Sequence, residues 1–222
     1  MREGAPMQDV VDFLARRWPQ LLELAVEHLL LVLTAVVFAT LIGVTIGVLV
    51  YRSPPLSSLA TSVTATILTI PSLALFALMV VWVGLGDRSA IIALTAYALL
   101  PIVRNTVTGL QEVDPAVSES ARGMGLSARS RLLRIDLPLA WPVILTGVRV
   151  ATMLIVSIAA IAAYIGAGGL GNWIFDGLAR RGSVVALPLI ISGTLGVVLV
   201  AFLLDAFFIL VNKLTVPKGL QN

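Results

Sequence analysis

The stretch LLLVLTAVVFATLIGVTIGVLV, residues 29–50, contains no charged side chain over 22 positions. At about 1.5 Å per residue it forms a helix about 33 Å long, which is enough to cross a hydrocarbon layer of about 30 Å. The apolar run is too long for a secretory signal, and Pro54 and Pro55 follow it in place of a small-residue cleavage site. We therefore expect residues 29–50 to span a membrane and residues 1–28 to remain as an N-terminal surface segment.

The composition of the whole chain agrees with a membrane protein. Of 222 residues, 59% are hydrophobic and 12% are charged, and the mean hydropathy is +1.03. Soluble domains are about half apolar and about one-quarter charged, so the composition argues against a soluble fold. The chain has no cysteine and a single histidine, His28, which excludes disulfides and thiolate chemistry and argues against a histidine-built metal site.

Four further apolar blocks follow the first span, at residues 56–83, 90–103, 143–165 and 184–211. The block 56–83 is too long for an upright span and carries Pro71, so we expect a tilted or kinked helix there. The block 90–103 reaches across a membrane if it extends towards Leu110 with Arg104 snorkelling. The sequence thus predicts an all-α polytopic protein with about five transmembrane helices in a domain at 29–211, followed by a C-terminal tail at 212–222.

The distribution of basic residues sets the expected orientation. If the loop at 104–142 is cytoplasmic, eight basic residues lie inside: Arg52, Arg104, Arg122, Arg129, Arg131, Arg134, Lys213 and Lys218. Six then lie outside: Arg2, Arg16, Arg17, Arg88, Arg180 and Arg181. The excess inside places the N-terminus outside and the C-terminus inside. Because these residues are spread between apolar blocks, they indicate a lipid bilayer as the partner and no nucleic acid.

The polar loop between the third and fourth blocks carries the start and stop signals of two short helices. It reads DPAVSESARGMGLSARSRLLRIDLPLAWP over residues 114–142. Asp114 is a favourable N-cap, Pro115 suits the first helical position, and glycines at 123 and 125 end that helix. Ser127 then caps a second, basic helix, which we expect to stop before Pro138.

The spacing of this loop resembles the EAA loop of ABC importer permeases, E-A-A-x3-G-x9-I-x-L-P. Ser120 stands where the family pattern has alanine, a small-for-small change; the matching residues are Glu119, Ser120, Ala121, Gly125, Ile135, Leu137 and Pro138. In that family the loop forms a coupling helix that docks in a cleft of a separate ATPase. The resemblance places Glu119, Ala121 and Gly125 at the joint, with Leu126 in the same loop and residues Ser127 to Arg134 flanking it. The alternative is a basic juxtamembrane loop that touches anionic headgroups.

Two other segments are similar to one branch of these permeases. They are TIPSLALFALMVVWVGLG at 69–86 and AAYIGAGGLGNWIFDGLAR at 162–180, which look like the permeases for the osmoprotectants glycine betaine, choline and carnitine. The resemblance implies import by alternating access across the cytoplasmic membrane of a prokaryote. It also implies a second permease chain, identical or related, with two ATPase subunits and an extracytoplasmic substrate-binding protein. The alternatives are a permease for methionine or another small solute, or an ATP-independent channel or carrier.

The chain lacks the motifs of an enzyme. It contains no G-x-x-x-x-G-K-[ST] phosphate loop, so we expect ATP and Mg²⁺ on the partner ATPase and no cofactor, metal or catalytic residue in this chain. Gly166, Gly168 and Gly171 satisfy G-x-G-x-x-G, but they follow an apolar span and not a strand. We interpret them as an external turn before a short helix at 173–178, which either helps to gate the outer mouth or anchors the chain at the interface.

Polar side chains inside the apolar blocks are candidates for the translocation path. Before Pro71, one helix face carries Ser58, Ser62, Thr66 and Thr69, and Ser72 follows the proline. We take Ser62, Thr66, Thr69, Pro71 and Ser72 as path candidates; the alternative is that the hydroxyls bond their own helix.

Two charged residues lie well inside the apolar blocks. Arg149 and Asp205 each lie six residues from the expected inner end of a span, at a depth of about 9 Å. We expect them to form an intramembrane charge pair, the alternative being that each snorkels separately.

Overall fold

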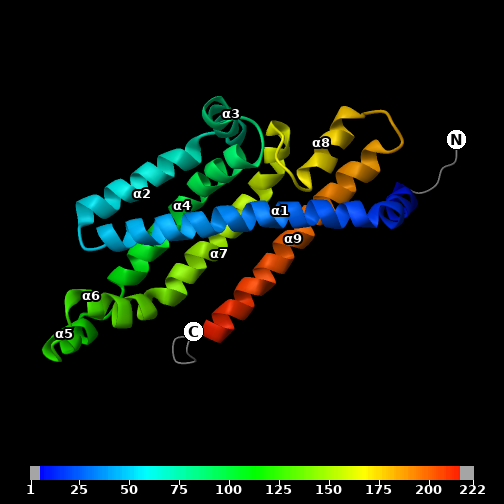
Figure 1. Cartoon of the computed structure of the whole chain (residues 1–222). Coiled ribbons are helices and arrows are strands. Elements are labelled where there is room, and N and C mark those ends of the chain that lie inside the picture. Colours follow the sequence, from blue (N-terminus) through cyan, green and yellow to red (C-terminus); the bar gives the residue numbers. More distant parts are fainter. Residues whose placement is uncertain (1–5, 216–222) are drawn as a thin grey trace. The chain divides into compact units, whose positions relative to one another are not determined.

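The computed structural model describes residues 6–215, and the side chains from residue 8 onward. The ends of the expected N-terminal segment and C-terminal tail, at 1–5 and 216–222, lie outside the described residues. Within this range the chain forms helices and no strand (Figure 1). The α-helices are α1 (Pro6–Val50), α2 (Pro54–Thr69), α3 (Ser72–Val83), α4 (Asp87–Gln111), α5 (Pro115–Gly123), α6 (Ala128–Arg131), α7 (Leu137–Ala162), α8 (Gly171–Ala179) and α9 (Ala186–Thr215). A π-helix, η1 (Leu132–Asp136), precedes α7, and a 3₁₀ turn, η2 (Ala163–Ile165), follows it.

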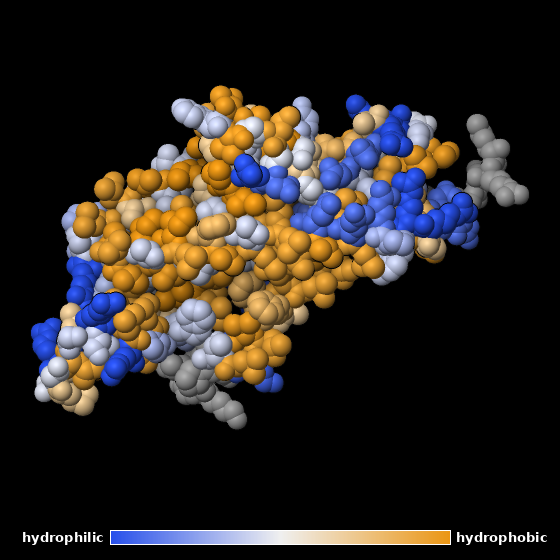
Figure 2. All heavy atoms as spheres, viewed as in Figure 1, coloured by the Kyte–Doolittle hydropathy of each residue, from blue (hydrophilic) through white to orange (hydrophobic). Residues whose placement is uncertain are grey.

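Four described helical segments are long and apolar enough to cross a membrane: Gln8–Val50, Asp87–Gln111, Ala128–Ile165 and Ala186–Thr215. A fifth span is obtained if α2 and α3 together form one broken span. Figure 2 shows hydrophilic side chains over the N-terminal part of α1 and over α5 and α6, whereas the surface along the rest of α1 is apolar. The all-α polytopic architecture expected from the sequence is therefore confirmed.

The helix expected at 56–83 is interrupted and not merely kinked. Pro71 lies between α2 and α3 and caps α3 with φ −56° and ψ 134°, an extended conformation. Proline has no N–H to bond the preceding turn, and it disfavours helical geometry at the residue before it. The chain therefore leaves the helix for two residues and starts again at Ser72.

The expected stop before Pro138 is wrong. From Ala128 the chain stays helical through η1 into α7, and Pro138 lies in the first turn of α7. The Leu137 N–H bonds the carbonyl of Leu132 in the wide π pattern. A π turn shifts the hydrogen-bond register by one residue, so the helix absorbs the missing N–H of Pro138.

The first helix continues well beyond the expected span. α1 has 45 residues, and its one non-helical residue is Arg17 (φ −118°, ψ 18°), two positions before Pro19. Because Pro19 cannot donate to the preceding turn, a kink at this point is the expected result. Residues 6–28 are thus helical and continuous with the predicted span at 29–50.

Two compact units share these helices. In the described part, the first contains residues 6–35, 70–95 and 152–204, with a core that includes the fully buried His28, Phe76 and Leu170. The second contains residues 36–69, 96–151 and 205–215.

Close helix packing in the second unit depends on α1 glycines. A Cβ at Gly43 would lie 2.7 Å from Ile102 Cγ2, and one at Gly47 would lie 2.5 Å from Thr106 Cγ2. The two glycines therefore let α1 approach α4 closely.

Candidate functional site

The first helix of the loop that joins α4 to α7, α5, has strong end signals. Asp114 accepts a hydrogen bond from the Ala116 N–H at 2.8 Å, and Pro115 occupies the first helical position. At the other end the Leu126 N–H bonds Ala121 O at 3.1 Å, and Gly125 adopts φ +82°. This 6→1 bond with a left-handed glycine is the Schellman arrangement. Both ends of α5 are therefore fixed by local residues.

Asp136 fastens the loop internally, and the sequence reasoning missed it. Its carboxylate is 4% exposed; it accepts from Ser118 Oγ on α5 at 3.2 Å and lies 3.6 Å from Arg131 Nε on α6. Asp136 occupies the single variable position between Ile135 and Leu137 in the motif, so the pattern gave no reason to select it. A buried carboxylate thus ties α5 to the start of the α7 helix.

The motif residues divide between the inner and outer faces of the loop. Ala121 is fully buried and packs α5 onto the loop, whereas Glu119 and Ser120 are exposed. Beside them Val117 and Met124 are 40% and 71% exposed, so α5 presents both apolar and acidic groups. The other motif residues are Gly125, Ser127 and Pro138, which are exposed, and Leu126, Ile135 and Leu137, which are half-buried.

The start of α7 also borders a hollow of about 370 Å³ in the second unit. Its lining is almost entirely apolar: Val44, Leu133, Leu137, Pro138, Trp141 and Ile144. The motif residues Leu137 and Pro138, at the start of α7, therefore face an apolar space.

Two of the hydroxyl groups proposed for the path, those of Thr66 and Thr69, are exposed and bonded to their own helix. On α2, Thr66 Oγ1 donates to Ser62 O at 2.9 Å and Thr69 Oγ1 to Thr66 O at 2.7 Å. Ser62, Thr66 and Thr69 thus share one exposed face of α2. Pro71 is exposed and Ser72 half-buried at the start of α3. Their role in a path stays a prediction.

Arg149 and Asp205 meet in the second unit. Arg149 donates from Nε to Asp205 Oδ1 at 2.7 Å and from Nη2 to Oδ2 at 2.8 Å. The side chains are 39% and 32% exposed. The contact is a two-pronged guanidinium–carboxylate pair, the strongest geometry for such ions, with one edge left open.

The glycine-rich turn after α7 is held by side chains that the sequence reasoning did not select. In the first unit the Gly168 N–H donates to Asp87 Oδ1 and the Gly169 N–H to Glu27 Oε2, both at 2.9 Å. His28 is fully buried beside the turn, and its Nε2 lies 3.1 Å from Val156 O. Contacts from α1 and α4 therefore define this turn, and no local motif could have identified them.

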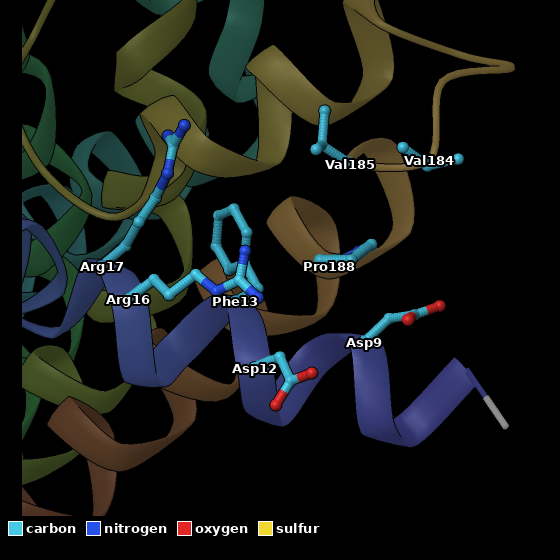
Figure 3. Close-up of a pocket in the computed structure, with 8 residues that line it drawn as sticks. All are labelled: Asp9, Asp12, Phe13, Arg16, Arg17, Val184, Val185 and Pro188. Atoms are coloured by element: carbon cyan, nitrogen blue, oxygen red, sulfur yellow. The ribbon is translucent and has the colours of Figure 1, made fainter. Parts of the chain in front are cut away.

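A charged hollow of about 500 Å³ lies in the first unit at the N-terminal end of α1 (Figure 3). Its lining comes from α1, from the α8–α9 connection and from the first turn of α9: Asp9, Asp12, Phe13, Arg16, Arg17, Val184, Val185 and Pro188. The Arg17 guanidinium lies 5.2 Å from the Phe13 ring centre, and Phe13 packs edge-on against Trp173 of α8 at 5.3 Å. The same aromatic contact attaches α8 to α1.

Among the described residues no group of three or more His, Cys, Asp or Glu side chains is placed to hold a metal ion. The candidate site therefore has three features. They are the exposed helix α5 with a cap at each end, the partly exposed Arg149–Asp205 ion pair, and the glycine-rich turn held by Glu27 and Asp87.

Comparisons with known proteins assign this arrangement to a family. The family model described as "binding-protein-dependent transport system inner membrane component" matches residues 18–216. The osmoprotectant import permease protein OsmW of Salmonella typhimurium is 38% identical over 96% of this chain and 100% of its own length. The carnitine transport permease protein OpuCB of Listeria monocytogenes is 36% identical over 97% of both chains.

A solved structure has the same fold. The methionine ABC transporter MetNI, in an inward-facing conformation, contains a chain that superposes with a TM-score of 0.78. The match covers 89% of this chain and 96% of that chain at 21% identity, which supports the fold alone. The chain is therefore a multi-pass membrane protein of the family of binding-protein-dependent transport system inner membrane components, the permease subunit of an ABC importer whose ATP is hydrolysed by a separate subunit.

Proposed function

We propose that this permease imports osmoprotectants of the glycine betaine, carnitine and choline class across the cytoplasmic membrane of a prokaryote. The observation that carries the proposal is the set of relatives named for these solutes, at 34–38% identity over 96–97% of this chain. Both segments that first resembled osmoprotectant permeases, 69–86 and 162–180, lie inside the matched range.

The family implies ATPase subunits and a substrate-binding protein as partners. We further propose an assembly of two permease chains, identical or related, with two ATPases that bind ATP and Mg²⁺ and one extracytoplasmic binding protein. The exposed surface of α5, with Glu119, Val117 and Met124, supports docking of this helix on the ATPase.

The contacts of the loop support transmission of motion from α5 to the membrane. α5 is capped at both ends, so it moves as a rigid unit. Its Ser118 bonds Asp136, which belongs to the continuous helix that leads into α7. Closure of an ATPase dimer against α5 would therefore displace α7, and the permease would alternate between its two open states.

The first experiment is purification of the tagged permease from its membrane in mild detergent, with mass spectrometry and an ATPase assay of the complex. Glu119→Lys is expected to reduce the recovered ATPase at least about tenfold, because it reverses a charge within the docking surface. Glu112→Lys is the matched control, since Glu112 is also exposed but lies outside α5 and the motif. A permease that never recovers an ATPase would instead favour a channel or carrier.

The co-purified binding protein then tests the solute. Titration with glycine betaine, carnitine, choline and methionine is expected to give binding of one or more of the first three and none of methionine. Binding of methionine alone would replace the osmoprotectant proposal with the alternative small-solute importer.

A further inference from the structure

A row of polar contacts joins α7 to α9 in the second unit. Besides the Arg149–Asp205 pair, the Trp141 Nε1–H donates to Thr215 Oγ1 at 2.9 Å. Asn212 lies two helical turns beyond Asp205 on the same face of α9 and is half-buried. We call these five residues, Trp141, Arg149, Asp205, Asn212 and Thr215, the α7–α9 polar seam.

The described residues 8–215 leave one edge of the seam accessible. About one-third of each charged side chain stays accessible, 39% for Arg149 and 32% for Asp205. A charged pair facing hydrocarbon costs several kcal/mol, and charges within membrane segments accordingly face protein or a water-filled cavity. The open edge of the pair therefore faces the path or a protein neighbour and not lipid.

We propose that the open edge of the Arg149–Asp205 pair is a transient binding site for a zwitterion that carries a carboxylate and a quaternary ammonium group. This inference rests on the proposed function, and it names the solute class that the inner half of the path would recognise. The solute carboxylate accepts the hydrogen bonds of the Arg149 guanidinium in place of Asp205, while the ammonium group moves beside Asp205. The ammonium group of the solute pairs with Asp205, and its carboxylate pairs with Arg149. All four charges therefore stay paired during the exchange.

The exchange suits a transport step because the ion pairs that form are similar in free energy to the ion pair that breaks. The guanidinium trades one carboxylate for another of the same geometry. A quaternary ammonium has no N–H, so Asp205 holds it by charge alone. Binding is therefore weak, and a site along a conduction path must be weak enough for its occupant to leave.

Arg149 should distinguish between solutes. Glycine betaine has both a carboxylate and a quaternary ammonium group, whereas choline has no carboxylate for Arg149 to bind. Removal of the Arg149 charge therefore penalises the zwitterion more than the cation. A purely structural pair would affect both solutes in the same proportion.

The test is uptake of labelled glycine betaine and labelled choline by the assembled importer in proteoliposomes, at saturating binding protein. Arg149→Gln is expected to lower the ratio of betaine to choline uptake about tenfold, the worth of one charge-assisted hydrogen bond to a ligand. Arg149→Lys keeps the charge and is expected to hold the ratio within about threefold. Equal loss of both solutes, with lysine as damaging as glutamine, would overturn the site and leave an interhelical clamp.

Two further variants separate loss of the binding site from a failure to assemble. If Arg149→Gln does not assemble, or if only betaine is imported, Asp205→Asn should lower betaine uptake about tenfold while ATP hydrolysis continues. Unchanged uptake would overturn the proposal. Thr45→Val is the control for assembly, because the Thr45 hydroxyl is exposed and bonds only its own helix at Leu41 O. A wild-type importer that takes up neither solute would reject the proposed function itself, before any variant is compared.

Discussion

The α5 loop at 114–127 and the glycine-rich turn at 165–171 are both short connections, but they are specified in different ways. The loop is fixed by residues within it: Asp114 caps α5 and Gly125 ends it. The turn is fixed from outside by Glu27 of α1 and Asp87 of α4, which lie 142 and 81 residues from their glycine partners. A helix that carries its own end signals holds its shape by itself, whereas the turn keeps its shape only while distant helices stay in place.

The largest expected effect is at the start of α8. A Cβ at Gly171 would overlap the carbonyl oxygen of Ala160 and lie 2.9 Å from the Ala163 Cβ. Because backbone and not a flexible side chain occupies the space, we expect Gly171→Ala to destabilise the protein by about 2–3 kcal/mol. The thermal midpoint of the detergent-solubilised complex measures this.

Gly123→Ala in α5 is the matched control, since a Cβ there meets nothing within 4 Å. It should leave the midpoint unchanged or raise it slightly, because alanine favours a helix over glycine. If the two variants behaved alike, the tight packing of the turn would not be its source of stability.

The next prediction removes one of the distant partners. Glu27→Ala deletes the acceptor of the Gly169 N–H, and we expect hydrogen exchange at 168–169 to accelerate at least about tenfold, as loss of a charge-assisted hydrogen bond implies. Exchange at 114–127 should not change. Glu27→Gln keeps an acceptor oxygen and should lie between the two. Acceleration in both regions would mean that Glu27 supports the whole chain and not the turn.

This contrast explains how far the sequence alone could reach. Asp114, Pro115 and Ser127 act on their own neighbours, so the two loop helices could be predicted from order alone. Arg149 and Asp205 could be paired because few charges lie inside the apolar blocks and equal depth leaves little choice.

Other features could not be predicted from the sequence. The partners of Gly168 and Gly169 depend on which helices fold against the turn, a property of the tertiary structure. The continuous helix through Pro138 depends on a π turn, which shifts the register by one residue and has no compositional signature. Asp136 was hidden in the same way, because it stands at a position that the motif leaves free.

The third prediction concerns the N-cap of α5. Asp114→Ala removes the acceptor of the Ala116 N–H and should cost about 1 kcal/mol of local helix stability. Faster hydrogen exchange over 116–118, with 165–171 unchanged, is the expected result. Asp114→Asn retains a capping oxygen and should restore protection. A change in the glycine-rich turn would contradict the local origin of the α5 structure.

The smallest expected effect is at Ser120, where this chain departs from the alanine of the family pattern. Its hydroxyl is exposed and donates to Ala116 O of its own helix at 2.8 Å. Ser120→Ala should therefore change stability by no more than about 0.5 kcal/mol, because it gains helix propensity and loses only an intrahelical bond. ATPase recovery and solute uptake should equal those of the unmodified permease, whereas Ser120→Leu, which adds volume at an exposed docking position, should reduce both. A loss with alanine would show that the hydroxyl itself contacts the ATPase, and α5 would then depend on a partner as the glycine-rich turn does.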